Sequence, residues 1–299
     1  MGVLISTLIP IGLIFLSGFL LQKKQLLDVR SVSGVALYIL TPALVFRTFY
    51  TTEPDYDVFL IVLFAVIFLI VMLLLNKLLT WVLRWDAPTE SGMTLSTSFM
   101  NAGNYGAPLI LFAFGEQAFA YAVIFMVIQS FFMSTIGVYI ANRSNMTGAD
   151  ALRVVLKMPA FFALLLGVLF QWLQVTIPPT YFDSISMLGE ASIPVVMVVL
   201  GMQLAKISLA SLEWKLISIG TAVRLVVSPV IAWGLTELLQ TNDLLSTVLI
   251  VAVAMPTAAT IAMISVEFHS SPDLVSSITL LTTILSVPSL WILLLIIGT

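Results

Sequence analysis

Apolar residues gather in ten stretches along the chain, each about 20 residues long or more and separated by short polar connections. About 20 helical residues cross the roughly 30 Å hydrocarbon core of a bilayer. A transmembrane β-barrel would show short segments of alternating polarity, and the run from Phe59 to Leu75 does not alternate. The pattern therefore predicts an all-α polytopic membrane protein with ten transmembrane helices, over residues 3–22, 32–51, 58–84, 88–115, 117–142, 157–177, 181–205, 214–239, 244–266 and 273–298.

Composition agrees with this pattern and excludes several classes of function. Of the 299 residues, 60% are hydrophobic and 9% are charged, against roughly 25% charged residues in a globular domain. A net charge of −3 offers no basic surface to a nucleic acid, so no nucleic-acid partner is expected. The chain has no cysteine, which excludes disulfides and thiolate metal sites.

The few basic residues predict the orientation of the chain. Ten of the 12 Lys and Arg side chains fall in or beside connections on one side of the predicted bilayer, and the opposite connections are mainly acidic. Basic connections face the cytoplasm, so both termini are expected outside it. The ten residues are Lys23, Lys24, Arg30, Lys77, Arg84, Arg143, Arg153, Lys157, Lys206 and Lys215.

The second half of the chain resembles the first at an offset near 152 residues. Because each half holds five spans, an odd number, the second half must be inserted upside down relative to the first. Such inverted repeats are typical of secondary transporters, which bind their substrate at the repeat interface near the midplane. We predict a first repeat at 1–142, a cytoplasmic linker at 143–156 and a second repeat at 157–299; the matched pairs are Pro42 with Pro194, Asn104 with Pro256, and Phe114-Gly115 with Phe268-His269.

Two spans carry residues that interrupt a helix. Span four contains two Asn, two Gly and Pro108 within eight residues, and span nine contains Pro256 at the matching place. Proline lacks an N–H group, and unwound backbone at membrane depth is tolerated only when it is buried in protein or lines a cavity. The free N–H groups after Tyr105 suit an anion, and the amides of Asn101 and Asn104 can donate further hydrogen bonds. A proline kink with Asn side chains joining helices is the structural alternative.

Three polar side chains inside spans have two interpretations each. A charge at a helix centre costs about 3 kcal/mol on insertion scales, so Glu190 and Arg224 each need a partner or water. Glu190 could carry a proton or bind a cation, or it could be protonated and hydrogen-bonded. Arg224 could attract an anion, or it could pair with backbone carbonyls of a broken helix. Gln129 could donate into a cavity or bond to a neighbouring helix.

These residues together resemble the auxin efflux carrier family in its compact bacterial form, over nearly the whole chain. The motifs that carry the resemblance are Asn101 with Gly106 and Pro108-Leu109; Met255-Pro256 followed by Glu267-Phe268, Pro272-Asp273 and Ser276; Ala222-Val223-Arg224 with Pro229; and Glu190-Ala191 with Leu200-Gly201.

The resemblance implies an elevator-type carrier of small organic acid anions in the inner membrane. Spans 1, 2, 6 and 7 would form a scaffold, often dimeric, and spans 3–5 and 8–10 a mobile transport domain. Asn101 would hold the carboxylate, with Gln129 and Val45 lining the site. With the residues of both breaks, the expected substrate site comprises Asn101, Asn104, Tyr105, Gly106, Pro108, Gln129, Val45, Pro256 and Thr257, and Glu190 and Arg224 have coupling or charge roles.

Two departures and two alternatives bear on the mechanism. Plant carriers have an acid–base pair in span three, whereas residues 58–75 are wholly apolar here, and the 143–156 connection is short. Transport is expected to be proton-linked or a uniport. A sodium-coupled symporter of the bile-acid carrier type is the alternative, and the few acids and amides near the breaks weaken it. An enzyme is not expected because the spans hold no His and no pair of acids, and no cofactor is expected.

Overall fold

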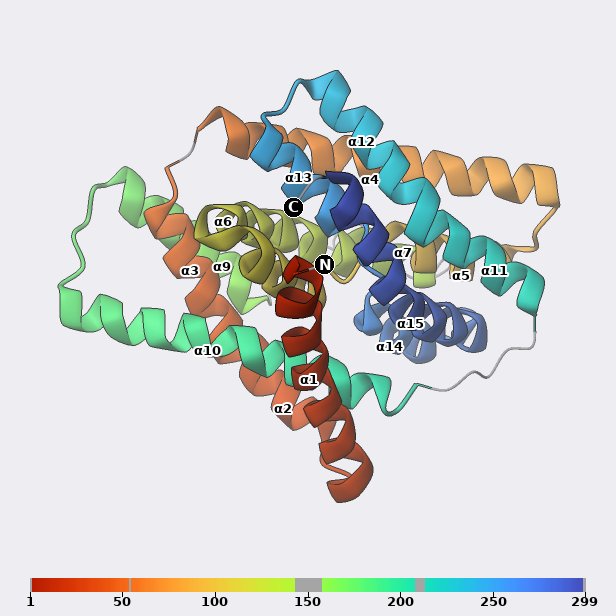
Figure 1. The fold of residues 1–299 in the computed structure, drawn as a ribbon, viewed down its shortest axis with the longest axis horizontal. Coiled ribbons are helices and arrows are strands. Elements are labelled where there is room, and N and C mark those ends of the chain that lie inside the picture. Colours follow the sequence, from red (N-terminus) through yellow and green to blue (C-terminus); the bar gives the residue numbers. More distant parts are fainter. Residues whose placement is uncertain (1, 54, 143–157, 208–212, 298–299) are drawn as a thin grey trace.

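The computed structural model describes residues 2–53, 55–142, 158–207 and 213–297, and these residues are helical apart from their connections (Figure 1). The predicted linker at 143–156 lies outside the described residues. Within the described part, six helices are long and apolar enough to cross a membrane: Val29–Thr51, Tyr56–Leu83, Ala102–Ala141, Pro179–Leu204, Trp214–Leu239 and Pro272–Ile297. The prediction of an all-helical polytopic membrane protein is therefore confirmed.

The helices begin and end within a few residues of the predicted stretches. Four π-helical turns, Ala36–Leu40, Ala102–Gly106, Met133–Gly137 and Val223–Val227, lead directly into the helices that follow them. The helices are α1 Gly2–Gln25, α2 Val29–Val35, α3 Thr41–Thr51, α4 Tyr56–Leu83, α5 Ala87–Ser98, α6 Ala107–Phe132, α7 Val138–Ala141, α9 Pro159–Trp172, α10 Pro179–Leu204, α11 Trp214–Ala222, α12 Ser228–Leu239, α13 Asp243–Val253, α14 Ala259–Glu267 and α15 Pro272–Ile297.

Short polar side chains in the connections set where helices begin. Asp28, Asp55, Asp86 and Asn242 each accept a hydrogen bond from a backbone N–H group in the first turn of the helix that follows. Such caps satisfy donors that have no partner inside the helix. Within α6, Gly115 has a φ of 82°, a left-handed value that favours glycine, and it divides the helix into two arms.

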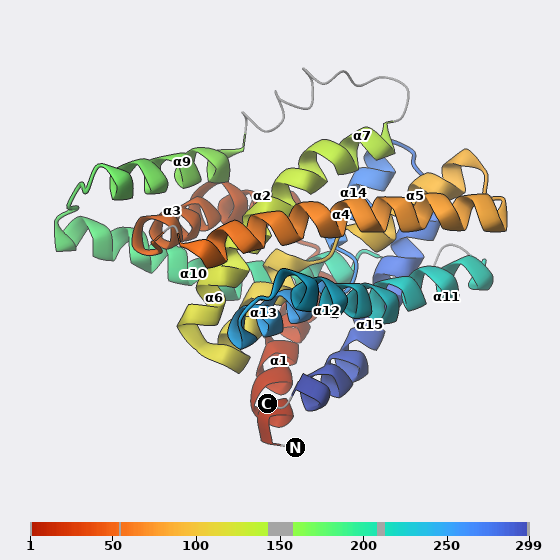
Figure 2. The same ribbon diagram turned by 90° about the horizontal axis from the view of Figure 1, so that it is seen from above.

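The helices pack in two groups (Figures 1 and 2). The first group is α1, α2, α3, α9 and α10; α1 crosses and contacts α10, and α3 packs against α9. The second group contains α4 to α7 and α11 to α15. Helix α6 contacts both groups, because it packs on α4 and α13 and also on α1 and α3. The start of α1 and the end of α15 lie close together in both views.

Glycines allow the closest helix contact in the first group. A Cβ atom on Gly18 of α1 would overlap the backbone oxygen of Val198, and a Cβ atom on Gly201 of α10 would overlap the backbone oxygen of Phe15. The two helices therefore touch backbone to backbone at their crossing.

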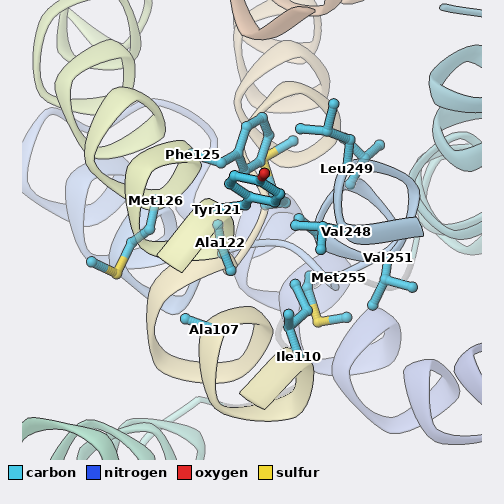
Figure 3. Packing of buried hydrophobic residues seen from close by; sticks show 14 of the residues in the cluster. Ala107, Ile110, Tyr121, Ala122, Phe125, Met126, Val248, Leu249, Val251 and Met255 are labelled. Atoms are coloured by element: carbon cyan, nitrogen blue, oxygen red, sulfur yellow. The ribbon is translucent and has the colours of Figure 1, made fainter. Parts of the chain in front are cut away.

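The largest core lies where α6 packs against α13. Figure 3 shows side chains from both arms of α6 facing those of α13 and of the residues just after it. Because α6 and α13 belong to different halves of the chain, this core joins the halves. The residues are Ala107, Ile110, Tyr121, Ala122 and Phe125 on α6, and Val248, Leu249, Val251 and Met255 opposite them.

Candidate functional site: two crossing helix breaks and an adjacent cavity

Two extended segments cross where the broken helices meet. Helix α5 ends at Ser98 and α13 ends at Val253, and helical structure resumes at Ala102 and Ala259. Between these ends, Met100 and Thr257 form an antiparallel bridge.

Two backbone hydrogen bonds flank this bridge. Asn101 N donates to Pro256 O at 2.8 Å, and Ala258 N donates to Phe99 O at 3.1 Å. Each break thus supplies partners for polar backbone groups of the other, as unwound backbone at this depth requires.

The two hydrogen bonds are equivalent under one shift along the chain. The donors Asn101 and Ala258 are 157 residues apart, and so are the acceptors Phe99 and Pro256. Under this shift the counterpart of Pro256 is Phe99, whereas the sequence comparison at an offset near 152 matched Pro256 with Asn104. Apolar spans give little signal for register, so a slip of a few residues is not visible in the sequence.

Arg224 lies behind the crossing and is fully buried. Its Nη1 donates to Thr97 O at 2.6 Å, and its Nη2 donates to Val253 O. These carbonyls lie at the C-terminal ends of α5 and α13. The sequence allowed Arg224 either to attract an anion or to pair with backbone carbonyls of a broken helix. The structure shows the second arrangement.

Buried polar side chains hold the crossing to the surrounding helices. Asn76 Nδ2 donates to Thr97 Oγ1 at 2.9 Å and to Met72 O at 2.8 Å. Thr257 Oγ1 donates to Ser96 O at 2.6 Å. Sequence reasoning missed this contribution of Asn76, although the sole amide in the apolar stretch of α4 is a visible signal.

A cavity of about 490 Å³ lies beside the crossing, between the two groups of helices. It brings together four of the predicted site residues: Asn101, Asn104, Pro108 and Gln129. Other polar positions on its wall are Ser33, Thr41, Ser130, Ser134, Ser192, Gln203 and Thr260, and the remaining lining is mainly Ala, Val, Leu, Ile, Phe and Met. Among the described residues that line it, none is charged.

Gln129 is the most informative side chain on this wall. It is only 5% exposed, and neither its Nε2 nor its Oε1 has a hydrogen-bond partner among the described residues. Gln203 Oε1 and Ser33 Oγ, on the opposite helices, also lack partners there. A buried polar group left without a partner costs about 1–3 kcal/mol, so these groups require a ligand or ordered water.

Asn101 presents a donor to the cavity. Its Oδ1 accepts from Asn104 N at 3.2 Å, which leaves its Nδ2 group to donate to a ligand. This cap begins the turn Ala102–Gly106, of which Ala102, Gly103 and Asn104 line the cavity, as do Ala107 and Pro108 at the start of α6. Helix N-termini carry partial positive charge, so this wall favours an anion.

Five predicted site residues do not line the cavity: Val45, Tyr105, Gly106, Pro256 and Thr257. The Tyr105 ring packs on Phe15 with centroids 4.9 Å apart, and its hydroxyl accepts from Ser286 Oγ at 3.4 Å. The predicted role of these five residues as substrate contacts stays a prediction.

Glu190 also lies outside the cavity. Its Oε1 is 3.3 Å from Arg47 Nη1, and its side chain is 63% exposed, whereas that of Arg47 is 28% exposed. The pair joins α10 to α3 on the outer face of the first helix group.

Comparisons with known proteins identify the family. A family model described as membrane transport protein matches residues 3–151 and 145–294. An uncharacterized transporter of Methanothermobacter thermautotrophicus is 26% identical over 296 residues, which is 95% of each chain. An uncharacterized transporter of Methanocaldococcus jannaschii is 28% identical over 208 residues, which is 67% of each chain. The chain therefore belongs to the membrane transport protein family, which is the auxin efflux carrier family.

Proposed function

We propose that this transporter carries a small organic acid anion across the cell inner membrane by alternating access. The observation that carries the proposal is Gln129, a residue of the cavity wall whose buried amide has no partner for either polar atom among the described residues; Asn101 and a helix N-terminus lie on the same wall. A carboxylate would accept from the amino groups of both amides and from the N–H groups of the turn. Together these donors would replace the hydrogen bonds to water that the carboxylate loses when it enters the site.

A monovalent, partly apolar anion fits this site best. The cavity wall carries no charged side chain among the described lining residues, and its donors gather near Asn101 and Gln129. A second carboxylate would face apolar lining without a counter-charge, which is unfavourable in a desolvated site. We therefore expect monocarboxylates to bind more tightly than dicarboxylates of similar size.

The proposal includes ten spans in two inverted repeats. The helix caps of Asp86 and Asn242 support it: they are 156 residues apart, each accepts from the N–H group three residues later, and each begins a helix that ends at the crossing. In this proposal the first helix group forms the scaffold and the second forms the transport domain. An elevator movement would displace the second group along the cavity interface.

The cavity extends toward the side that we propose to be cytoplasmic. Its wall includes Ser33, Ser134, Met158 and Gln203, which lie near the ends of their helices next to connections rich in Lys and Arg. The structure would then correspond to an inward-facing state, with both termini outside the cytoplasm.

A homodimer through the scaffold helices is part of the proposal. The Arg47–Glu190 pair lies on an exposed face of α3 and α10, where contact with lipid would be unfavourable for charged groups. A second copy covering this face would shield the pair.

Coupling to protons, or uniport, is favoured over coupling to sodium. The carbonyls at the ends of α5 and α13, which could otherwise bind a cation, already accept from Arg224. If Glu190 couples transport to protons, Glu190→Gln should remove the pH dependence of uptake into proteoliposomes. Retained pH dependence would reject that role.

The deciding experiment measures binding and uptake by the purified protein. A panel of mono- and dicarboxylates is first screened for thermal stabilisation, with and without sodium and across pH. Asn101→Ala should then lower the affinity for the best anion while the protein still folds, and Asn242→Ala, the same change outside the cavity, should not. Unchanged affinity of Asn101→Ala for every anion that stabilises the wild type would reject this site.

A further inference from the structure

Two helix C-termini converge on Arg224. Its guanidinium bonds to Thr97 O in the last turn of α5 and to Val253 O in the last turn of α13. The C-terminal end of a helix carries about half a negative elementary charge. Two such ends together carry about one negative charge, which one guanidinium balances.

Among the described residues, no carboxylate forms an ion pair with Arg224. In the parts of the chain that the structure describes, the ion pairs are Arg47–Glu190 and Lys77–Glu90, and neither involves Arg224. A fully buried cation is strongly unfavourable unless nearby groups compensate it. The two helix ends are therefore the compensating charge for Arg224, and Arg224 is theirs.

The helices that follow the two breaks begin at the cavity. The turn Ala102–Gly106 leads into α6, and Ala258 and Thr260 at the start of α14 also lie on the cavity wall. Each N-terminal end carries about half a positive charge, and no acidic side chain among the described lining residues balances them. Arg224 thus cancels the negative ends of the crossing and leaves its positive ends unbalanced toward the cavity.

We propose that Arg224 is the fixed counter-cation of the crossing. It positions both breaks, and by neutralising the two C-terminal ends it makes the cavity select an anion over a neutral analogue of the same shape. The positioning role rests on the geometry of the crossing alone. The selectivity role rests also on the proposed function, so the two roles are tested separately.

The positioning role is tested by thermal unfolding of the purified protein. Arg224→Met keeps much of the length but removes the charge, and its Tm should fall by about 10 °C because two helix ends lose their cation. Arg224→Lys keeps the charge but has one donor group, so its Tm should fall less than that of Arg224→Met. Arg224→Ala leaves space for a free guanidinium ion, and millimolar guanidinium should raise its Tm while leaving the wild type unchanged.

The control for these variants is Lys77→Met, which removes an exposed cation from its pair with Glu90. Its Tm should change little, and guanidinium should not raise it. A Tm for Arg224→Met equal to that of the wild type would overturn the proposal. If Arg224→Met does not fold, the Tm values of Arg224→Lys and Arg224→Ala decide. An equal fall in Tm for both variants, without recovery of Arg224→Ala by guanidinium, would also overturn the proposal.

The selectivity role is tested with phenylacetate and phenylacetamide, which share a shape and differ in charge. The wild type should bind the acid more tightly than the amide, and Arg224→Lys should keep this preference. Arg224→Met, or Arg224→Ala, should reduce the ratio of the two affinities by about tenfold, the loss of roughly 1.4 kcal/mol of electrostatic preference. An unchanged ratio would overturn the selectivity role. A wild type that prefers the amide would reject the proposed function, while the unfolding measurements still decide the positioning role.

Discussion

The two helix breaks share a backbone arrangement and differ in their side chains. Each donates one N–H group to the other and accepts one in return. At equivalent places, however, the first break has Asn101 and the second has Ala258, while the first has Met100 and the second has Thr257. Asn101 lies on the cavity wall, and Thr257 instead bonds to Ser96 O in the interior. The backbone pairing thus serves both breaks alike, whereas of the two bridged segments only the first places a polar side chain, Asn101, on the cavity wall.

The largest effect is expected when a negative charge is introduced at the first break. Asn101→Asp keeps the size of the side chain but places a carboxylate against the bound anion, and repulsion of several kcal/mol should lower affinity by more than about a hundredfold. Ala258→Asn adds an amide at the equivalent place and should change affinity by less than about threefold. Isothermal binding measurements on both variants test this, and equal effects would show that the breaks contribute alike.

Gln129 gives the next largest effect, with opposite signs for binding and stability. Gln129→Leu removes a donor to the anion and should lower affinity about tenfold, the value of one hydrogen bond to a charged group. It also removes two buried polar atoms without partners, so the unliganded protein should unfold at a higher temperature. Binding and unfolding curves recorded on one preparation check both signs. A lower Tm would mean that Gln129 has structural partners in the unliganded protein.

Thr257 should affect stability and leave binding nearly unchanged. Thr257→Val removes the hydrogen bond to Ser96 O in a fully buried place, so the free energy of unfolding should fall by about 1.5 kcal/mol. Thr260→Val, on the cavity wall, is the matched control and should change stability by less than about 0.5 kcal/mol. A large loss of affinity in Thr257→Val would give the second break a direct part in the site.

The smallest effects concern the helix caps that precede the two breaks. Asp86→Ala and Asn242→Ala should each lower stability by about 1 kcal/mol. Hydrogen bonds from the side chain and backbone of Thr89 lower the pKa of Asp86 below its usual 3.8. Its contribution should therefore be full above that value and decline as the pH falls through the lowered pKa. The Asn242 contribution should not vary in this range, and denaturation at several pH values distinguishes the two.

The helices were predictable because long apolar stretches and capping residues determine them locally. Pro108, Pro256 and the Asn and Gly residues of span four also marked the breaks correctly. The register of the crossing was not predictable, because neighbouring apolar residues are chemically alike and do not indicate which of them pairs with the other segment.

The wall of the cavity was predictable only in part. Gln203 and Ser33 come from helices far from the breaks in sequence, and packing alone brings them to the cavity. Tyr105 is adjacent to the cavity residue Asn104, yet its side chain turns inward to Phe15 and Ser286. The direction of a side chain on an irregular turn depends on tertiary contacts, and these cannot be predicted from the spacing of residues along the chain.

The contact between Gly18 and Gly201 has a mechanical consequence. Where α1 and α10 touch backbone to backbone, a slide of one helix past the other would bring larger side chains into the space that only glycine leaves. These two helices must therefore travel together or stay still together. Any large displacement in this molecule therefore has to occur along a different surface. The cavity lies on such a surface, between this pair of helices and the crossing.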